Sequence, residues 1–215
     1  MNIEAVVQKI AEVGIIPVVR AASLDHARRA VDAICEGGIP ILEITMTVPD
    51  APAVIREVIR QYGSAVLTGA GTVTTAAQAE ICIDAGAEFL VSPGLSAKVL
   101  HVAHRRGILA IPGALTPSEI MAAQEEGAKI IKIFPCGAAG GAKYLKDLRG
   151  PFPHATFIPT GGVSLANAAE YIAAGAFALG VGSDLVDTKA LHSGNPQKVV
   201  DAARAYIAAV RQARG

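Results

Sequence analysis

Residues 15–45 read IIPVVRAASLDHARRAVDAICEGGIPILEIT, and they contain one complete repeat of the chain. The stretch begins and ends with a short run of apolar, mostly β-branched residues, as the buried strands of parallel sheets do. Between the runs, Ser23 is a suitable helix N-cap, and the residues after it have apolar positions at helical spacing. A strand, a helix and a second strand in this order predict a right-handed crossover between parallel strands.

The same unit recurs along the whole chain. Eight apolar runs are separated by roughly 23 residues, and they begin near Ile15, Ile41, Ala65, Phe89, Leu109, Ile130, Thr156 and Phe177. Eight evenly spaced units favour a closed barrel, and the RAAS that follows the first run lacks the glycines of a dinucleotide-binding turn. We therefore predict a single (β/α)8 TIM barrel over residues 1–215, with residues 1–14 forming an amphipathic helix that packs on it.

Residues at the ends of the predicted helices support this division of the chain. Ser23, Ser96 and Thr116 precede helical patterns and are candidate N-caps. Four glycines follow such patterns, at the position where a left-handed residue commonly ends a helix: Gly37, Gly86, Gly127 and Gly175.

Composition excludes several classes of protein. Lys+Arg and Asp+Glu both number 19, so the chain has no broad field that would attract nucleic acid or an anionic membrane. No apolar run is long enough to span a bilayer. The three cysteines lie far apart without a CxxC motif, and we expect reduced thiols in a cytoplasmic protein. His101 and His104 have no third ligand nearby, so we expect no metal site.

Two charged residues interrupt apolar strands. Glu43 lies within ILEIT and Lys132 within IIKIF. One interpretation is a structural ion pair inside the barrel, although apolar residues would stabilise the fold as well. The other is chemistry, because burial lowers the pKa of a lysine and makes its neutral amine available to form a Schiff base with a ketone. A nearby carboxylate would supply the proton transfers that imine formation needs. We favour the interpretation that the two residues are catalytic.

Further polar and glycine-rich positions occur at the predicted strand ends, where barrel enzymes hold their substrates. Gly161 and Gly162 follow the seventh strand, and Gly182 and Ser183 close the eighth, which is the usual phosphate site of this fold. Arg20 ends the first strand and could bind a carboxylate or phosphate through two hydrogen bonds. Hydroxyl groups and a proline also occupy strand ends, at Thr45, Thr47, Thr72 and Pro93.

Nine motifs in order resemble the bacterial 2-keto-3-deoxy-6-phosphogluconate (KDPG) and 4-hydroxy-2-oxoglutarate (KHG) aldolases: GIIPVVR, GGIPILEIT, GAGTV, AGAEFLVSPG, PGALTPSE, KIFP, GPFP, IPTGGV and GVGSDLV. The resemblance implies a homotrimeric class I lyase that uses neither a metal nor another cofactor. It implies that Lys132 forms the imine and Glu43 is the general acid and base, with Thr72 and Pro93 around the pyruvyl half of a 2-keto acid. It also implies that Gly161, Gly162, Gly182 and Ser183 hold the substrate's phosphate.

One position departs from the pattern of this family. Many members carry an arginine shortly after the catalytic glutamate, where this chain has Thr47. The substrate carboxylate would then rely on Thr72, Thr47, backbone amides or Arg20. The galactonate epimer of KDPG and unphosphorylated KHG are therefore competing substrates. A phosphosugar isomerase or epimerase that forms no imine, and a catalytically silent phosphosugar-binding barrel, remain alternative readings.

Overall fold

Strands form within all eight apolar runs. The computed structural model describes residues 1–215. Its strands are β1 Ile15–Val19, β2 Ile41–Thr45, β3 Leu67–Gly71, β4 Phe89–Val91, β5 Leu109–Ile111, β6 Gly113–Ala114, β7 Ile131–Ile133, β8 Phe157–Pro159 and β9 Leu179–Val181.

The strands make two parallel sheets instead of the one eight-stranded sheet that we predicted. Their orders are β5-β4-β3-β2-β1-β9 and β6-β7-β8. The fifth run is divided at Pro112, which has no N–H for the sheet ladder; β5 pairs with β4 before it, and β6 pairs with β7 after it. On the other side, a single parallel bridge joins Thr160 to Gly180. The predicted parallel α/β fold is confirmed, whereas a continuous eight-stranded barrel is not found.

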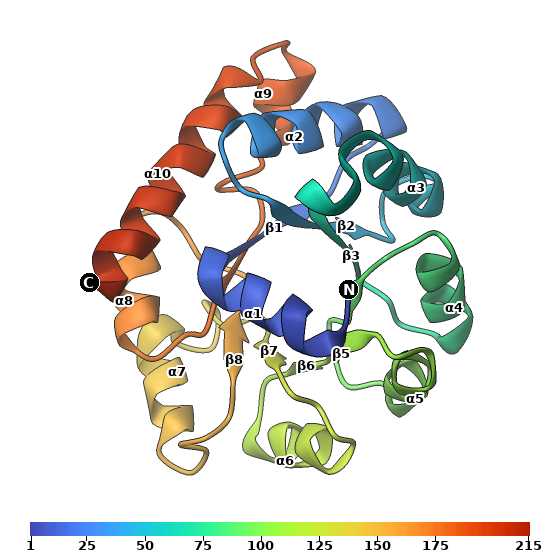
Figure 1. The fold of residues 1–215 in the computed structure, drawn as a ribbon. Helices are drawn as coiled ribbons and strands as arrows, with labels where there is room; N and C mark the ends of the chain where they lie inside the picture. Colours follow the sequence, from blue (N-terminus) through green and yellow to red (C-terminus); the bar gives the residue numbers. More distant parts are fainter.

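Helices follow the strands and surround them (Figure 1). They are α1 Ile3–Val13, α2 Leu24–Glu36, α3 Ala51–Tyr62, α4 Ala76–Asp84, α5 Ala97–Arg106, α6 Pro117–Glu125, α7 Gly141–Arg149, α8 Ala168–Ala173, α9 Thr188–His192 and α10 Gln197–Arg214, with a short 3₁₀ turn at Gly63–Ala65. None of these helices combines the length and apolar character that crossing a membrane requires.

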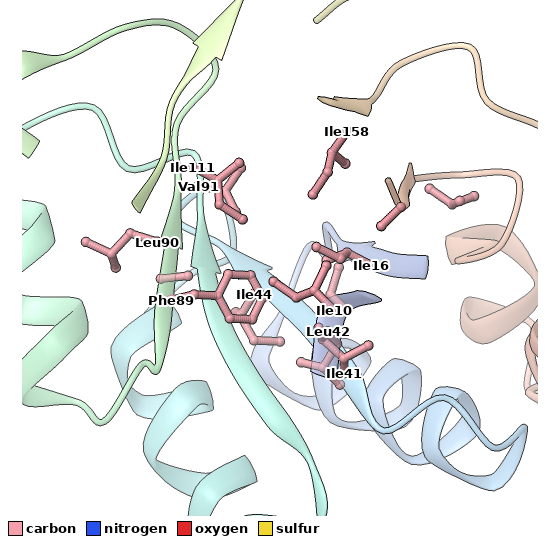
Figure 2. Packing of buried hydrophobic residues seen from close by; sticks show 14 of the residues in the cluster. Ile10, Ile16, Ile41, Leu42, Ile44, Phe89, Leu90, Val91, Ile111 and Ile158 are labelled. Atoms are coloured by element: carbon pink, nitrogen blue, oxygen red, sulfur yellow. The ribbon is translucent and has the colours of Figure 1, made fainter. Parts of the chain in front are cut away.

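The N-terminal helix forms where the sequence predicts it. Helix α1 crosses one end of the strands and buries Val6 and Ile10 on its inner face (Figure 1). Ile10 belongs to the same apolar cluster as Ile16 of β1 and Leu42 of β2 (Figure 2). The cluster includes residues from both sheets, so burial of apolar surface holds the two sheets together.

Most of the predicted helix ends are found. The Ser23 hydroxyl accepts a hydrogen bond from the His26 N–H at 3.2 Å, and Thr116 forms a reciprocal capping box with Glu119. Ser96 precedes α5 but makes no capping hydrogen bond. Three of the four glycines have the expected positive φ: 101° at Gly86, 81° at Gly127 and 90° at Gly175.

Gly37 is the exception among these glycines. Its φ is −69°, and the left-handed residue is Gly38, with a φ of 92°. Glycine is required at position 37 for a different reason, because a Cβ there would lie 2.4 Å from the Cβ of Ala203 on α10. The prediction of a left-handed Gly37 was therefore wrong by one position.

Candidate active site

Glu43 and Lys132 are buried side chains that belong to different sheets. Glu43 occupies the middle of β2, in the six-stranded sheet, and Lys132 the middle of β7, in the three-stranded sheet. Each residue is only 3 % exposed, and Lys132 is the only buried lysine of the chain, since the others are exposed apart from the half-buried Lys9. The prediction that these two charged residues lie inside the strands, away from solvent, is confirmed.

The surroundings move both groups toward their neutral forms. Loss of hydration lowers the pKa of Lys132, and the Arg20 guanidinium lowers it further, while Glu43 opposes both effects. Loss of hydration likewise raises the pKa of Glu43 against the attraction of Lys132 and Arg20. The protein therefore contains a buried amine of reduced basicity within electrostatic range of a carboxyl group.

The carboxyl group of Glu43 also has a free hydrogen-bonding atom. Its Oε1 is buried and has no hydrogen-bond partner. Gly71 at the end of β3 leaves space beside it, since a Cβ there would lie 2.5 Å from this oxygen. Buried polar atoms normally have partners, so an unpartnered oxygen beside an amine is suited to a ligand or to proton transfer.

Phe134 connects Lys132 to the glycine-rich loops. The Lys132 Nζ lies 4.8 Å from the centroid of the Phe134 ring, within cation–π range. The same ring packs against Gly161, where a Cβ would lie 3.2 Å from two of the ring carbons. Phe134 was not among the residues selected from the sequence, although its position two residues after Lys132 in KIFP was a usable signal.

The glycine-rich loops form one cleft with the end of β1. We call it the glycine-loop cleft; its volume is about 300 Å³ and it is lined by Val18, Arg20, Phe134, Thr160, Gly161, Gly162, Val163, Ser164, Gly182, Ser183 and Asp184. Five of these residues were selected from the sequence: Arg20, Gly161, Gly162, Gly182 and Ser183. Backbone N–H groups of glycine loops together with one guanidinium are suited to holding an anion such as phosphate.

Asp184 holds the two sides of this cleft together. Its Oδ2 accepts hydrogen bonds from the Leu165 N–H at 3.0 Å and from the Tyr206 hydroxyl at 2.6 Å. The loop after β8 is thereby tied to the loop after β9 and to α10. Sequence reasoning missed this residue because its partners lie 19 and 22 residues away in the chain.

The remaining predicted residues lie outside this cleft. Thr72 follows β3 in the left-handed conformation, with a φ of 57°, and Pro93 follows β4 by two residues. The Thr45 hydroxyl donates its single proton to the Val19 carbonyl at 3.0 Å. In the contact of 2.7 Å between the Thr45 and Thr47 hydroxyls, Thr47 is therefore the donor. Thr47 lines an adjoining cavity that shares Arg20 with the glycine-loop cleft.

The chain resembles known aldolases over most of its length. Residues 6–202 match the family described as KDPG and KHG aldolase. A 2-dehydro-3-deoxy-phosphogluconate aldolase of Dickeya dadantii is 38 % identical over 194 residues, which cover 90 % of this chain and 91 % of that one. A KHG/KDPG aldolase of Escherichia coli K12 is 37 % identical over 193 residues, 90 % of each chain.

A solved structure is similar in fold as well as in sequence. The KDPG aldolase of Legionella pneumophila, captured with pyruvate at low pH as a covalent carbinolamine intermediate, matches with a TM-score of 0.86. Its sequence identity is 34 %, and the match covers 93 % of this chain and 96 % of that one.

Proposed function

The chain belongs to the KDPG and KHG aldolase family, and on this premise we propose that its reaction centre is the buried pair Lys132 and Glu43. The protein is an aldolase, a lyase that breaks a carbon–carbon bond. The observation that carries the residue assignment is the burial of a single lysine, whose pKa is lowered, within electrostatic range of a carboxyl group. Neither charge would be needed for stability alone.

In the proposed mechanism the neutral Lys132 amine attacks the C2 ketone of KDPG. Glu43 transfers the protons that convert the carbinolamine into an imine with loss of water. Glu43 then accepts the proton of the C4 hydroxyl, and the C3–C4 electron pair moves into the protonated imine. Glyceraldehyde 3-phosphate leaves and an enamine remains. Protonation at C3 and hydrolysis of the resulting imine release pyruvate and regenerate the amine.

The two ends of the substrate require separate recognition. We assign the phosphate to the glycine-loop cleft, where Arg20 and the loop N–H groups would meet its charge. The hydroxyls of Thr72 and Thr47 and the ring of Pro93 are assigned to the pyruvyl half, where Thr47 would act as an acceptor because its own proton is donated to Thr45. Because Thr47 is uncharged, the carboxylate lacks a guanidinium at that position, and the Arg20 field is the available compensation.

Trapping with borohydride tests the role of Lys132. After incubation with pyruvate and reduction, one pyruvyl adduct on the Lys132 peptide is expected by mass spectrometry. Lys132→Ala should abolish both the adduct and turnover, while Lys98→Ala, at an exposed position on α5, serves as the matched control. A folded wild-type protein that forms no adduct would overturn the imine mechanism and favour an isomerase or epimerase that needs none.

Glu43→Gln tests the proton transfers separately. The amide preserves the shape of the side chain but cannot accept and return a proton. We expect slower adduct formation with pyruvate and slower cleavage of KDPG. An unchanged rate in both assays would remove Glu43 from the acid and base role without affecting the assignment of Lys132.

The galactonate epimer of KDPG, which differs from KDPG only at C4, is a second candidate substrate. The Thr47 hydroxyl is engaged with Thr45 and offers no cation, so recognition of the carboxylate that both epimers carry differs from that implied for members with an arginine. The comparison of kcat/KM for KDPG, its epimer and KHG decides between them. A preference for the epimer would revise the substrate but leave the lyase mechanism intact.

We also propose three features beyond the reaction centre. The two sheets would act as one closed barrel and one domain, supported by the Thr160–Gly180 bridge and the shared apolar cluster. A homotrimer is supported by exposed Ile81 and Met121, at 50 % and 54 %, and sedimentation equilibrium would test it. The three free cysteines support a cytoplasmic location.

A further inference from the structure

A second cavity adjoins the glycine-loop cleft across Arg20. We call it the histidine cavity; its volume is about 550 Å³ and it is lined by Arg20, Ala21, Ala22, His26, Thr47, Thr188, Lys189 and His192. These residues come from the loop between β1 and α2, the first turn of α2, the loop after β2 and helix α9. The reaction mechanism above uses only Arg20 and Thr47 among them.

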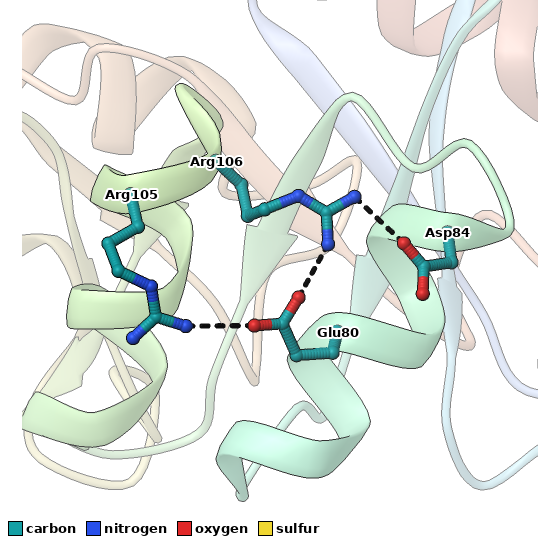
Figure 3. A network of polar contacts seen from close by, with 4 residues as sticks. All are labelled: Glu80, Asp84, Arg105 and Arg106. Carbon is teal, nitrogen blue, oxygen red and sulfur yellow. Dashed lines mark hydrogen bonds and ion pairs between the residues drawn. The ribbon is translucent and has the colours of Figure 1, made fainter.

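The polar lining of this cavity is basic or neutral, with no acidic residue. None of its four basic side chains, Arg20, His26, Lys189 and His192, forms an ion pair with a carboxylate. Elsewhere on the surface arginines are commonly paired, as in the network of Arg105 and Arg106 with acidic residues of α4 (Figure 3). Four unpaired bases around one cavity are unusual in a chain of zero net charge.

The neighbouring carboxylates are already engaged. Asp25 contacts Arg29 at 3.0 Å, and Asp187 contacts Lys198 at 2.7 Å while also capping α9. Neither is therefore free to neutralise the bases of the cavity.

The two imidazoles of the cavity contact each other. The rings of His26 and His192 lie edge to face, with centroids 5.1 Å apart and an interplanar angle of 73°. His26 stands in the first turn of the 13-residue α2, where the helix dipole favours an anion, while its own backbone N–H is capped by Ser23. The lining therefore combines two imidazole rings, two flexible cations and two threonine hydroxyls around one space.

We propose that the histidine cavity is a second anion-binding site, which takes a small carboxylate or phosphate and influences the reaction centre through Arg20. This goes beyond the proposed lyase activity, because the anion would bind outside the glycine-loop cleft and outside the reaction centre. Arg20 is the connection, since its side chain lines both cavities. Its positive field also lowers the pKa of Lys132 and of Glu43.

Binding of an anion would have two consequences. It would draw the Arg20 guanidinium toward the histidine cavity and away from a phosphate in the glycine-loop cleft. It would also offset part of the field that acts on Lys132, which favours the ammonium form of that side chain. Both effects slow the reaction, so we expect the anion to inhibit even a substrate that carries no phosphate.

Imidazole NMR signals provide a direct test that requires no enzyme activity. The chain has five histidines, and only His26 and His192 line the cavity, so the other three are internal controls. Inorganic phosphate and malonate are titrated separately at constant ionic strength. We expect the His26 and His192 signals to move together with one Kd, and the more effective of the two probes identifies the preferred anion.

Matched variants make the result specific. Lys189→Gln should weaken this binding about fivefold, as expected for loss of one exposed charge contact. Lys146→Gln, which also removes an exposed and unpaired lysine but on α7, should leave it unchanged. The proposal is overturned if neither probe shifts the His26 and His192 signals at lower concentration than the other three histidine signals. It is also overturned if Lys189→Gln and Lys146→Gln bind the anion with the same Kd.

An activity assay then tests the coupling. With KHG as substrate, malonate should inhibit the wild-type protein at lower concentration than it inhibits Lys189→Gln. Equal inhibition of both proteins would refute coupling through this cavity. If neither protein cleaves KHG or KDPG, the lyase proposal fails by itself, whereas the NMR titration still decides whether the anion site exists.

Discussion

The pH dependence of stability should reveal how Glu43 and Lys132 share a proton. We expect the folded pair to hold one titratable proton near neutral pH, as carboxylate and ammonium or as carboxylic acid and amine, because a net charge on a buried pair would cost hydration free energy. The unfolded chain also holds one, on the lysine, because the ordinary pKa values of the two groups are 4.5 and 10.5. Folding therefore neither takes up nor releases a proton at this pair, which gives no slope near neutral pH.

Each single substitution should create a slope, and the two slopes should have opposite signs. In Lys132→Met, Glu43 loses the ammonium that lowers its pKa, so the folded protein keeps a proton that the unfolded chain loses above pH 4.5. Stability then falls as pH rises, by at most about 1.4 kcal/mol per unit, until pH exceeds the raised pKa of Glu43. In Glu43→Gln, the folded amine lacks a proton that the unfolded chain retains up to pH 10.5. Above the lowered pKa of Lys132, the free energy of unfolding then rises with pH, again by at most about 1.4 kcal/mol per pH unit.

Urea denaturation followed by circular dichroism at pH 5, 6, 7, 8 and 9 measures these slopes relative to the wild type. The double variant Lys132→Met/Glu43→Gln is the control, and it should return to the wild-type dependence because no titratable group remains. Single variants whose stability runs parallel to the wild type at every pH would refute the reasoning. That result would mean that neither side chain is held in its neutral form by burial.

Two further substitutions test local features of the strands. Thr72→Gly should raise the free energy of unfolding by about 1 kcal/mol, because glycine adopts the left-handed backbone at this position without strain. It should also raise KM for the 2-keto acid, because the hydroxyl is lost. Denaturation and steady-state kinetics measure the two effects, and an unchanged KM would exclude Thr72 from substrate binding. Gly69→Ala should lower the free energy of unfolding by about 1–3 kcal/mol, since the new Cβ would lie 2.3 Å from the Phe89 ring. A thermal melt of Gly69→Ala that matches the wild type would contradict this account of the core.

Local patterns predicted the order of strands and helices and the burial of Glu43 and Lys132. Each charge lay between apolar β-formers, and such runs are buried on both faces in parallel sheets. The division of the fifth strand at Pro112 was not predicted, because a proline lacks the N–H for the sheet ladder but does not always end a strand, as Pro17 within β1 shows. Its consequence, the change of partner strand, depends on the neighbouring strands and could not be read from that run alone.

Contacts between segments that are distant in the chain could not be predicted from the sequence. Asp184 owes its structural role to hydrogen bonds with Leu165 and Tyr206, and the residues near it in the sequence indicate neither partner. The requirement for glycine at position 37 likewise comes from the approach of α10. The histidine cavity was missed for the same reason, because His26 and His192 are separated by most of the chain and meet only in the folded protein.

The placement of Glu43 and Lys132 on different sheets has a consequence during protein synthesis. A lysine in an unfolded nascent chain keeps its ordinary basicity and is almost entirely protonated at neutral pH, so it reacts slowly with the ketones and aldehydes of the cell. Its pKa falls only when folding buries β7 and removes the water around the amine. On the proposed mechanism the unfolded chain is therefore poorly reactive toward carbonyl metabolites, and folding generates the nucleophile.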